Sequence, residues 1–459
     1  MKNFTASAAA QAASGILCGS REGIHTEITA VITDSRKIQS GCLFAAIRGD
    51  NSDGHAYIDQ AVKAGAGAVL GEEIPEGLPV PGIRVDNTRM ALQKLAAWYL
   101  DQIHIPAVGI IGSAGKTSTK EMTALVLEQK YRVLKTEGNY NNELGVPLTI
   151  FRLTEADEIA VIEMGINHFG EMDRLGKIVR PDTAVMTNIG TAHLEFLGSR
   201  EGILKAKSEV FRHMNPDGCV ILNGDDDMLS TIHTVNGKEP VRYGIENPDV
   251  QIRAESVEAL GLEGMQFDLC TGKESKTVTV PSPGIHSVYN ALAGAAVGIR
   301  YGLTLDEIAL GIRKYKGLPG RQHIVKGKSI TVIDDCYNAN PSSMKSSLSI
   351  LQNFKGRRIA ILGDMGELGE KAETLHREVG QYAASLNIDR LYCIGKLGKQ
   401  IGEAYASESG DSQQNVLCFD SKETLLESLH ELIQPEDIVL VKASHFMGFD
   451  SVVRELENF

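Results

Sequence analysis

A glycine-rich turn between an apolar strand and a helix constrains the fold of this chain more than any other feature. The apolar run Ala107–Ile111 leads into Gly112-Ser-Ala-Gly115-Lys116-Thr117, and a helical pattern continues to Gln129. Backbone N–H groups of such a turn face phosphate oxygens, and the helix N-terminus adds the positive end of its dipole. The lysine can reach the terminal phosphates of a nucleotide, and the threonine hydroxyl can ligate Mg²⁺. An ordinary strand-to-helix turn has no need of Gly-Lys-Thr here, so the pattern predicts a nucleotide-phosphate loop.

The predicted loop is shorter than usual. A common P-loop has four residues between its glycines. Here two residues separate Gly112 from Gly115, and Ile110 occupies the place of the first glycine. The residues expected at the phosphates are Gly112, Ser113, Ala114, Gly115, Lys116, Thr117 and Ser118.

Strand and helix patterns alternate around this loop. Strand-like runs occur at Ile159–Ile162, Thr183–Thr187 and Cys219–Leu222. Strands that alternate with helices predict a parallel sheet with crossover helices. Residues Val250–Val280 instead resemble consecutive strands joined by turns, which predicts an antiparallel edge. The Ala- and Gly-rich stretch His286–Tyr301 is expected to be a helix buried against the sheet.

Two linkers divide the 459 residues, a length that suggests about three domains. His104-Ile105-Pro106 forms the first, because the residue before a proline avoids helix, and Lys316–Gly320 forms the second. We therefore expect an α/β protein with a small N-terminal α/β domain (1–105), a central P-loop domain (106–317) and a Rossmann-like C-terminal domain (318–459). The N-terminal strand and helix are expected at Ile83–Val85 and Met90–Leu100, and the C-terminal strands at Ser329–Ile333, Arg358–Leu362, Arg390–Ile394 and Ile438–Val441.

Composition excludes several kinds of partner. The net charge is −13 and aromatic residues are 5% of the chain, whereas nucleic-acid-binding surfaces are usually basic and rich in stacking side chains. The seven cysteines are scattered without a CxxC pair, which is typical of reduced thiols in the cytoplasm. The N-terminus is too polar for a signal peptide and is expected to form a short surface helix. No apolar run approaches the roughly 18 residues that a membrane span requires.

Polar residues at two strand ends are candidate metal ligands. Glu163 ends one predicted strand, and His193 follows another in the run from Thr187 to Glu195. Ligands of α/β proteins bind at the carboxyl ends of the strands. His193 alone fits an ordinary loop histidine, but beside a nucleotide loop it becomes a candidate metal ligand. Lys205 and Lys207 lie in the helical stretch Glu201–Phe211 and, by themselves, are expected to be solvated charges.

Ordered motifs along nearly the whole chain resemble those of the Mur ligases. They are TDSRKIQSGCLFAAIRGDNSDGH (Thr33–His55), GSAGKTSTKE (Gly112–Glu121), GNYNNELGVP (Gly138–Pro147), IEMGINHFGEM (Ile162–Met172), TNIGTAHLEFLGS (Thr187–Ser199), IHSVYNALA (Ile285–Ala293), LPGRQ (Leu318–Gln322), DDCYNANPSSM (Asp334–Met344) and ILGDMGELGE (Ile361–Glu370). The resemblance implies three domains, which bind the UDP end of one substrate, ATP, and the incoming amine in turn.

The resemblance also implies a role for particular residues. Lys116 would hold the β- and γ-phosphates, Thr117 and Glu163 would ligate one Mg²⁺, and His193 and Lys207 would serve a second. Lys207 matches a family lysine that CO₂ converts to N6-carboxylysine. Asn290 would contact adenine, Arg321 the γ-phosphate, Asp335 the ribose, and Tyr337 would pack near the adenine. Ser35 and Arg36 would lie near the UDP group, and Asn338, Asn340 and Pro341 near the amine. The chain departs from the family pattern at His445, where arginine is typical.

The motifs Asp334–Met344 and Ile361–Glu370 most resemble those of the Mur ligases that catalyse the last cytoplasmic step of the pathway. That step is an ATP-dependent addition of D-alanyl-D-alanine to a UDP-N-acetylmuramoyl-tripeptide through an acyl phosphate, for peptidoglycan synthesis. The resemblance further implies a monomer, whereas composition predicts a cytoplasmic protein that binds no nucleic acid and does not insert into a membrane.

Three other classes of function are alternatives to this ligase. A folylpolyglutamate synthase or an earlier Mur ligase would differ in the amine it accepts. A P-loop kinase or NTPase switch would hydrolyse ATP without any amine, and a catalytically inactive nucleotide-binding module would hydrolyse none. The short loop, together with Glu163, His193 and Lys207, favours the ligase.

Overall fold

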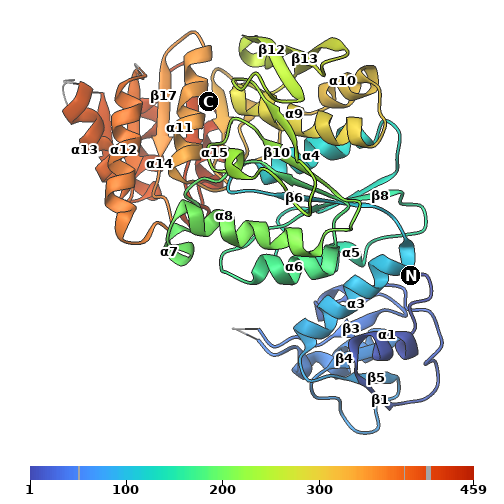
Figure 1. Cartoon of the computed structure of the whole chain (residues 1–459). Helices are drawn as coiled ribbons and strands as arrows, with labels where there is room; N and C mark the ends of the chain where they lie inside the picture. Colours follow the sequence, from blue (N-terminus) through green and yellow to red (C-terminus); the bar gives the residue numbers. More distant parts are fainter. Residues whose placement is uncertain (50–51, 387, 410–414) are drawn as a thin grey trace. The chain divides into compact units, whose positions relative to one another are not determined.

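The computed structural model describes residues 1–49, 52–386, 388–409 and 415–459. Residues 50 and 51 of the N-terminal motif therefore lie outside the described part. The chain forms two compact units: residues 1–111, 131–184 and 208–219 make the first, and residues 112–130, 185–207 and 220–459 make the second. Three sheets with flanking helices give a three-domain α/β architecture (Figure 1).

The N-terminal sheet has the strand order β1-β5-β4-β3-β2. Its pairs are parallel except for β1 with β5, which run antiparallel. The strands are β1 (Ile16–Gly19), β2 (Val31–Ile32), β3 (Leu43–Ala45), β4 (Ala68–Gly71) and β5 (Pro81–Arg84), and the helices are α1 (Ala6–Ala13), α2 (Ile58–Lys63) and α3 (Thr88–Ile103).

An aromatic cluster joins α1 and α3 to the rest of the first unit. The ring of Phe4 lies edge-on to Trp98, Tyr99 and Phe151, with centroids 5.4, 5.5 and 5.9 Å away. The buried hydroxyl of Tyr99 donates to the carbonyl of Leu153 at 2.8 Å. Edge-to-face packing of this kind adds to the energy of burial, so the N-terminal helices are anchored by apolar contacts rather than by a linker alone.

The central sheet has nine strands in the order β14-β13-β12-β11-β10-β9-β6-β8-β7. The strands are β6 (Ala107–Ile111), β7 (Val133–Lys135), β8 (Ile159–Glu163), β9 (Thr183–Met186), β10 (Cys219–Asn223), β11 (Val241–Gly244), β12 (Ile252–Ala259), β13 (Met265–Cys270) and β14 (Ser275–Val280). The helices of this region are α4 (Lys116–Leu127), α5 (Gly145–Ile150), α6 (Glu171–Val179), α7 (Leu194–Leu197), α8 (Arg200–Ser208), α9 (Ile285–Arg300) and α10 (Leu305–Arg313). Strands β12, β13 and β14 pair antiparallel, which confirms the predicted edge.

Small residues let α9 lie close against α4, the helix that follows the phosphate loop. A Cβ at Gly298 would come 2.7 Å from a Val126 methyl group, and one at Gly294 would come 3.2 Å from Met122. The buried length of α9 agrees with the predicted buried helix. The α4–α9 packing therefore fixes the position of α4 within the second unit.

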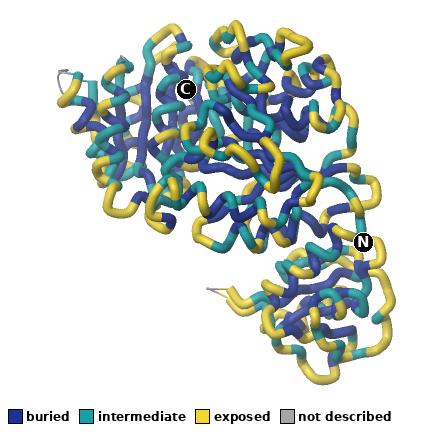
Figure 2. Tube along the Cα trace, viewed as in Figure 1, coloured by how far each residue is buried: buried dark blue, intermediate teal, exposed yellow. Residues whose placement is uncertain are grey.

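The C-terminal sheet has the order β15-β16-β20-β17-β18-β19. Its strands are β15 (His323–Lys326), β16 (Thr331–Asp334), β17 (Arg358–Leu362), β18 (Arg390–Ile394), β19 (Val416–Phe419) and β20 (Ile438–Lys442), and its helices are α11 (Pro341–Ile350), α12 (Ala372–Ala384), α13 (Gly398–Ser409), α14 (Lys422–Leu432) and α15 (Asp450–Leu456). All pairs are parallel except β15 with β16, a Rossmann-like arrangement. Helices α11, α12 and α13 lie side by side next to β17 (Figure 1), and the strands are the buried layer (Figure 2).

The structure divides one of the predicted helices into two elements. The stretch predicted as one helix over 201–211 is α8 up to Ser208, followed by a 3-10 turn at Glu209–His213. The short N-terminal surface helix is present as predicted, and this helix, α1, packs through four alanines on its buried face. Over the described residues, no helix combines the length and apolar character that crossing a membrane would require.

A buried ion pair fixes the C-terminal end of β20. Lys442 is 2% exposed, and its Nζ lies 2.5 Å from a carboxylate oxygen of Asp335 and 3.1 Å from the carbonyl of Asn338. We expect Lys442→Met to lower the free energy of unfolding by about 3 kcal/mol, because it leaves Asp335 buried without its counter-ion. The control is Lys399→Met, which removes an exposed ion pair with Asp420 from the same domain. Denaturant unfolding should show a barely measurable change for the control, and equal effects would contradict the buried-pair interpretation.

Candidate active site

The phosphate loop leaves β6 through a glycine that has no room for a side chain. A Cβ at Gly112 would lie 1.9 Å from the hydroxyl oxygen of Thr187. That hydroxyl donates to the carbonyl of Ala114 at 2.6 Å. The close approach of the Thr187 side chain and the loop backbone therefore requires glycine at position 112.

Asn188 fixes the same loop from its other side. Its side-chain oxygen accepts from the N–H of Ala114 at 2.9 Å, its side-chain nitrogen donates to the carbonyl of Ala114 at 3.1 Å, and its own carbonyl accepts from the N–H of Ser113 at 3.0 Å. The hydroxyl oxygen of Ser113 is buried and makes no hydrogen bond to the described residues. A preformed loop with a spare hydroxyl suits an anionic phosphate.

We expect Gly112→Ala to destabilise the protein by about 2 kcal/mol, since the new methyl group overpacks the Thr187 contact. The matched control is Gly190→Ala near the same loop, where a Cβ would be an ordinary 3.4 Å from Ser113. Thermal or denaturant unfolding compares the two variants. A loss at position 190 as large as that at position 112 would refute the steric argument.

Two lysines meet at the start of the phosphate loop. Lys116 and Lys207 each donate from Nζ to the carbonyl of Gly112 at 3.0 Å. Lys207 is 1% exposed, so it is not the solvated charge that its sequence context suggested. Burial, and then the positive charge of Lys116, hold the pKa of the Lys207 amine well below its usual range. The pair concentrates basic groups where phosphates are expected.

Other predicted nucleotide-binding residues lie on the neighbouring helices. Asn290 on α9 is buried, and its side-chain oxygen accepts from the Thr119 hydroxyl at 2.9 Å. Gly115, the residue before α4, has φ +77°, and a Cβ there would come 3.2 Å from Asn290. The structure thus places Asn290 beside the phosphate loop, and its predicted contact with adenine stays a prediction.

His193 lies in a strained loop before α7. Its φ is +59°, a conformation that costs energy for a residue with a side chain. Its Nδ1 atom is 2.6 Å from a carboxylate oxygen of Glu367 but is not aligned with it for a hydrogen bond. Glu367 has the same left-handed conformation. Such strain is typical of functional positions, and the role of His193 as a metal ligand stays a prediction.

The C-terminal residues form a second group. The guanidinium carbon of Arg321 lies 4.0 Å from the centre of the Tyr337 ring, and the His445 ring is 5.4 Å from the same ring. A cation over an aromatic face is a favourable contact. His445, which replaces the expected arginine, thus stands beside Tyr337, a predicted nucleotide-binding residue that also contacts Arg321.

Three predicted residues of the C-terminal domain have structural contacts. Asp335 accepts from the Ser347 hydroxyl and the N–H of Gln322 in addition to its Lys442 pair. Asn340 caps α11 by accepting from the N–H of Ser343 at 2.9 Å. The side-chain oxygen of Asn338 accepts from the following N–H at 2.9 Å. These contacts hold the loop 335–340 in place, and the substrate roles of the three residues stay predictions.

Glu163 ends β8 as a buried carboxylate. Its Oε1 accepts from the Asn141 side chain at 2.7 Å, and its backbone N–H donates to the Thr136 hydroxyl at 3.0 Å. Its Oε2 is buried and makes no hydrogen bond to the described residues. A buried carboxylate oxygen without a donor fits a hard cation such as Mg²⁺. No three His, Cys, Asp or Glu side chains of the described residues converge as a ligand set, so the structure does not itself display a complete metal site.

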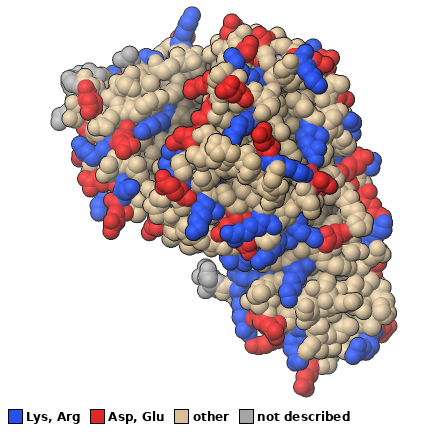
Figure 3. Space-filling model, in the orientation of Figure 1, with Lys and Arg blue, Asp and Glu red and all other residues tan. Residues whose placement is uncertain are grey.

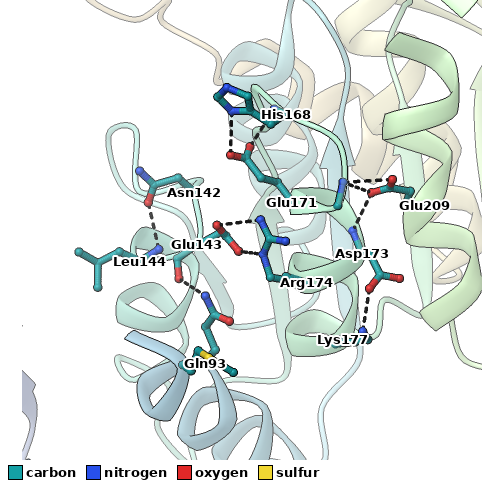
Figure 4. Close-up of polar contacts among 12 residues, drawn as sticks. Gln93, Asn142, Glu143, Leu144, His168, Glu171, Asp173, Arg174, Lys177 and Glu209 are labelled. Atoms are coloured by element: carbon teal, nitrogen blue, oxygen red, sulfur yellow. Dashed lines mark hydrogen bonds and ion pairs between the residues drawn. The ribbon is translucent and has the colours of Figure 1, made fainter. Parts of the chain in front are cut away.

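One asparagine and two glutamate side chains hold the loops of the motifs Gly138–Pro147 and Ile162–Met172 (Figure 4). Asn142 accepts from the N–H groups of Leu144 and Gly145, and Glu143 pairs with Arg174 of α6. Glu209 accepts from the N–H groups of Gly170 and Asp173 and so caps α6. A carboxylate at a helix N-terminus is stabilised by the helix dipole.

The N-terminal candidates lie on a 3-10 turn, Ser35–Lys37. The Arg36 side chain is 84% exposed and makes a two-point ion pair with Asp34. The guanidinium is therefore accessible to a ligand while its carboxylate partner keeps it oriented. Across the face in Figure 3, basic and acidic side chains are interspersed, so an anionic substrate must be recognised by local groups of this kind.

A phosphate loop on a parallel sheet, followed by a Rossmann-like domain, defines an α/β protein of the nucleotide-phosphate-binding class. Three family models match the chain: Mur ligase family, catalytic domain (residues 27–99), Mur ligase middle domain (110–298), and Mur ligase, glutamate ligase domain (320–445). The chain belongs to the Mur ligase family.

Named relatives match this chain over nearly its full length. UDP-N-acetylmuramoyl-tripeptide–D-alanyl-D-alanine ligase of Escherichia coli (strain K12) is 38% identical, with 96% of this chain and 97% of that protein covered. The ligase of the same name from Bacillus subtilis (strain 168) is also 38% identical, with 94% of each covered. A crystal structure of MurF from Acinetobacter baumannii has a TM-score of 0.90 at 32% identity, with 99% of each chain covered. MurF ligase from Thermotoga maritima in complex with ADP has a TM-score of 0.83 at 28% identity, with 93% of this chain and 97% of that chain covered.

Proposed function

We propose that this protein joins D-alanyl-D-alanine to a UDP-N-acetylmuramoyl-tripeptide and converts ATP to ADP and phosphate. The observation that carries the proposal is the match, over 96% of this chain, to a ligase named for that reaction. The preformed phosphate loop and the ADP-bound MurF neighbour support the use of ATP. The reaction belongs to peptidoglycan synthesis, and we place the enzyme in the cytoplasm as a monomer.

The chemistry begins with an unreactive group. A carboxylate resists attack by an amine because its oxygen is a poor leaving group. In the proposed reaction the terminal carboxylate of the tripeptide attacks the γ-phosphate of ATP, which gives an acyl phosphate and ADP. The amine of the dipeptide then attacks the acyl carbon, and phosphate leaves.

The residues of this chain would act chiefly by position and charge. Lys116 and Arg321 would neutralise charge on the phosphoryl oxygens, Asn290 and Tyr337 would hold adenine, and Asp335 would hold the ribose. Thr117 and Glu163 would hold one Mg²⁺, and His193 with a carbamylated Lys207 would hold a second. Bound Mg²⁺ would neutralise phosphate charge. Ser35 and Arg36 would contact the UDP end, and Asn338 and Asn340 the dipeptide. The buried, unpaired oxygen of Glu163 and the depressed pKa of Lys207 support these assignments.

The test mixes the full chain with ATP, Mg²⁺ and UDP-N-acetylmuramoyl-tripeptide, and measures phosphate with and without D-alanyl-D-alanine. Release that requires both substrates, with a product heavier by the dipeptide, is expected. Release without the dipeptide would indicate a hydrolase or another amine. ATP binding without any release would assign the chain to a different reaction of the family. Tripeptides ending in lysine and in diaminopimelate are tested in parallel, and the preferred one identifies the third residue.

A further inference from the structure

Two cysteines lie directly opposite each other on neighbouring strands of the C-terminal sheet. Strands β18 and β19 run parallel, and Cys393 is the register partner of Cys418. Partners in a parallel pair point to the same face of the sheet, and their strands are about 4.8 Å apart. That spacing is within the roughly 4.4–6.8 Å between Cα atoms that a disulfide can span.

One helix residue lies against both sulfur atoms. A Cβ at Gly402 of α13 would be 2.7 Å from the sulfur of Cys418 and 3.4 Å from the sulfur of Cys393. Because both sulfurs are that close to one point, they face each other under α13. The missing side chain at position 402 leaves the space that the two thiols occupy.

The two thiols differ in access and acidity. Cys393 is buried and Cys418 is exposed. A hydrogen bond from the Cys393 thiol lowers the pKa of Cys418 to about 7, whereas burial holds the pKa of Cys393 well above its usual range. Thiolates are the reactive form of cysteine, so the pair has one accessible nucleophile and one sheltered partner.

We propose that Cys393 and Cys418 form a redox-active pair that a peroxide oxidises to a disulfide. The Cys418 sulfur attacks one peroxide oxygen, and the O–O bond breaks. Cys418 becomes a sulfenic acid, and the other peroxide oxygen leaves as water with the proton of the thiol. The Cys393 sulfur then attacks the Cys418 sulfur, the S–O bond breaks, and the hydroxyl leaves as water with the Cys393 proton. Two electrons pass from the sulfurs to the peroxide. This site is separate from the residues of the proposed ligase reaction, so its test does not depend on that function.

The place of β19 in the sheet makes the bond both reachable and labile. Among the described residues, β19 is an edge strand that pairs only with β18, so it can shift toward its neighbour. Cys418 is exposed, so the bond would be accessible to thiols, and exposed disulfides are among the readily reduced ones. We therefore expect a dithiol reductant to restore both thiols.

The experiment oxidises the reduced full chain with a small excess of hydrogen peroxide, blocks remaining thiols with N-ethylmaleimide and digests with trypsin without reduction. Cleavage between the cysteines places Cys393 on peptide 391–396 and Cys418 on peptide 400–422. The expected product is these two peptides joined, lighter by two hydrogen atoms than their sum. Five of the seven cysteines should still react with N-ethylmaleimide after unfolding.

Variants separate this pair from general oxidation. Cys418→Ser should abolish the linked peptide. Cys393→Ser should leave a sulfenic acid on Cys418 that dimedone traps. The control variant Cys270→Ser should form the linked peptide as the unaltered chain does. Dimers linked through Cys418, oxidation of Cys418 to a sulfinic acid in the unaltered chain, or unreacted thiols would each overturn the proposal. The unaltered chain is decisive by itself if a variant fails to fold.

Discussion

Lys116→Ala is expected to abolish ATP turnover while the fold survives. The lysine amine lies at the phosphate loop, and loss of one such preorganised donor typically costs about 10²–10³-fold in rate. Alanine is a good helix former, and Lys116 is the first residue of α4, so the helix should still begin there. ADP formation measures the loss, and circular dichroism with thermal unfolding verifies the fold.

The matched control for Lys116→Ala is Lys205→Ala. Lys205 is an exposed lysine on α8, so its removal changes the net charge equally without touching the loop. The control should keep full turnover. Retained turnover in Lys116→Ala would refute the phosphate-loop assignment whatever the control does.

Lys207→Ala is expected to lose activity by a similar factor and to regain part of it with added short carboxylic acids such as acetate. The amine is buried beside Lys116, where a second positive charge is unfavourable and the neutral form is favoured. A neutral amine is the form that combines with CO₂ to give a carbamate. A carboxylic acid in the space left by alanine would replace that carbamate. Activity measured against acetate concentration tests the idea.

Two comparisons make the rescue specific. Acetate should not restore Lys116→Ala, because a carboxylate cannot replace a cation at the phosphates. Lys205→Ala should need no rescue, although it lies two residues from Lys207. Full activity of Lys207→Ala without acetate would remove the proposed metal-binding role of this lysine.

Much of the fold was predictable because its elements depend on patterns of residues that are contiguous in the sequence. The strands β6, β17 and β18 begin and end at the predicted residues, since each is a compact apolar run between polar or turn-forming neighbours. The phosphate loop was predictable for the same reason, as strand, glycines, lysine and helix are contiguous. The two boundaries between the three domains stay predictions.

The contacts that fix the site depend on residues distant in the sequence. Thr187 and Asn188 hold Ala114 across more than 70 residues, and Asn141 orients Glu163. Threonine and asparagine are common in turns, so their residue type alone gave no signal. All three lie in motifs quoted for the family resemblance, but none was assigned a role there.

The burial of Lys207 did have a signal in the sequence. Ile203, Ala206 and Lys207 follow the three- and four-residue spacing of one helix face, and all three are buried, whereas Lys205 is exposed. An apolar face that includes a lysine marks that lysine as buried. The positions of Lys205 and Lys207 relative to the apolar face of the helix therefore distinguish the two lysines, whereas their charges do not.

Thr187 and Asn188, which hold the phosphate loop, lie far from it in the sequence, and this separation has a consequence for biosynthesis. Domains generally fold during translation at about 5–20 residues per second. Ala114 is made 74 residues before Asn188, so the loop waits roughly 4–15 seconds for the side chain that fixes it. A nascent chain that ends before Thr187 would carry the whole Gly-Lys-Thr motif and yet be unable to hold it in shape. Nucleotide binding is therefore expected to appear only after Asn188 has been translated, 74 residues after Ala114 of the loop.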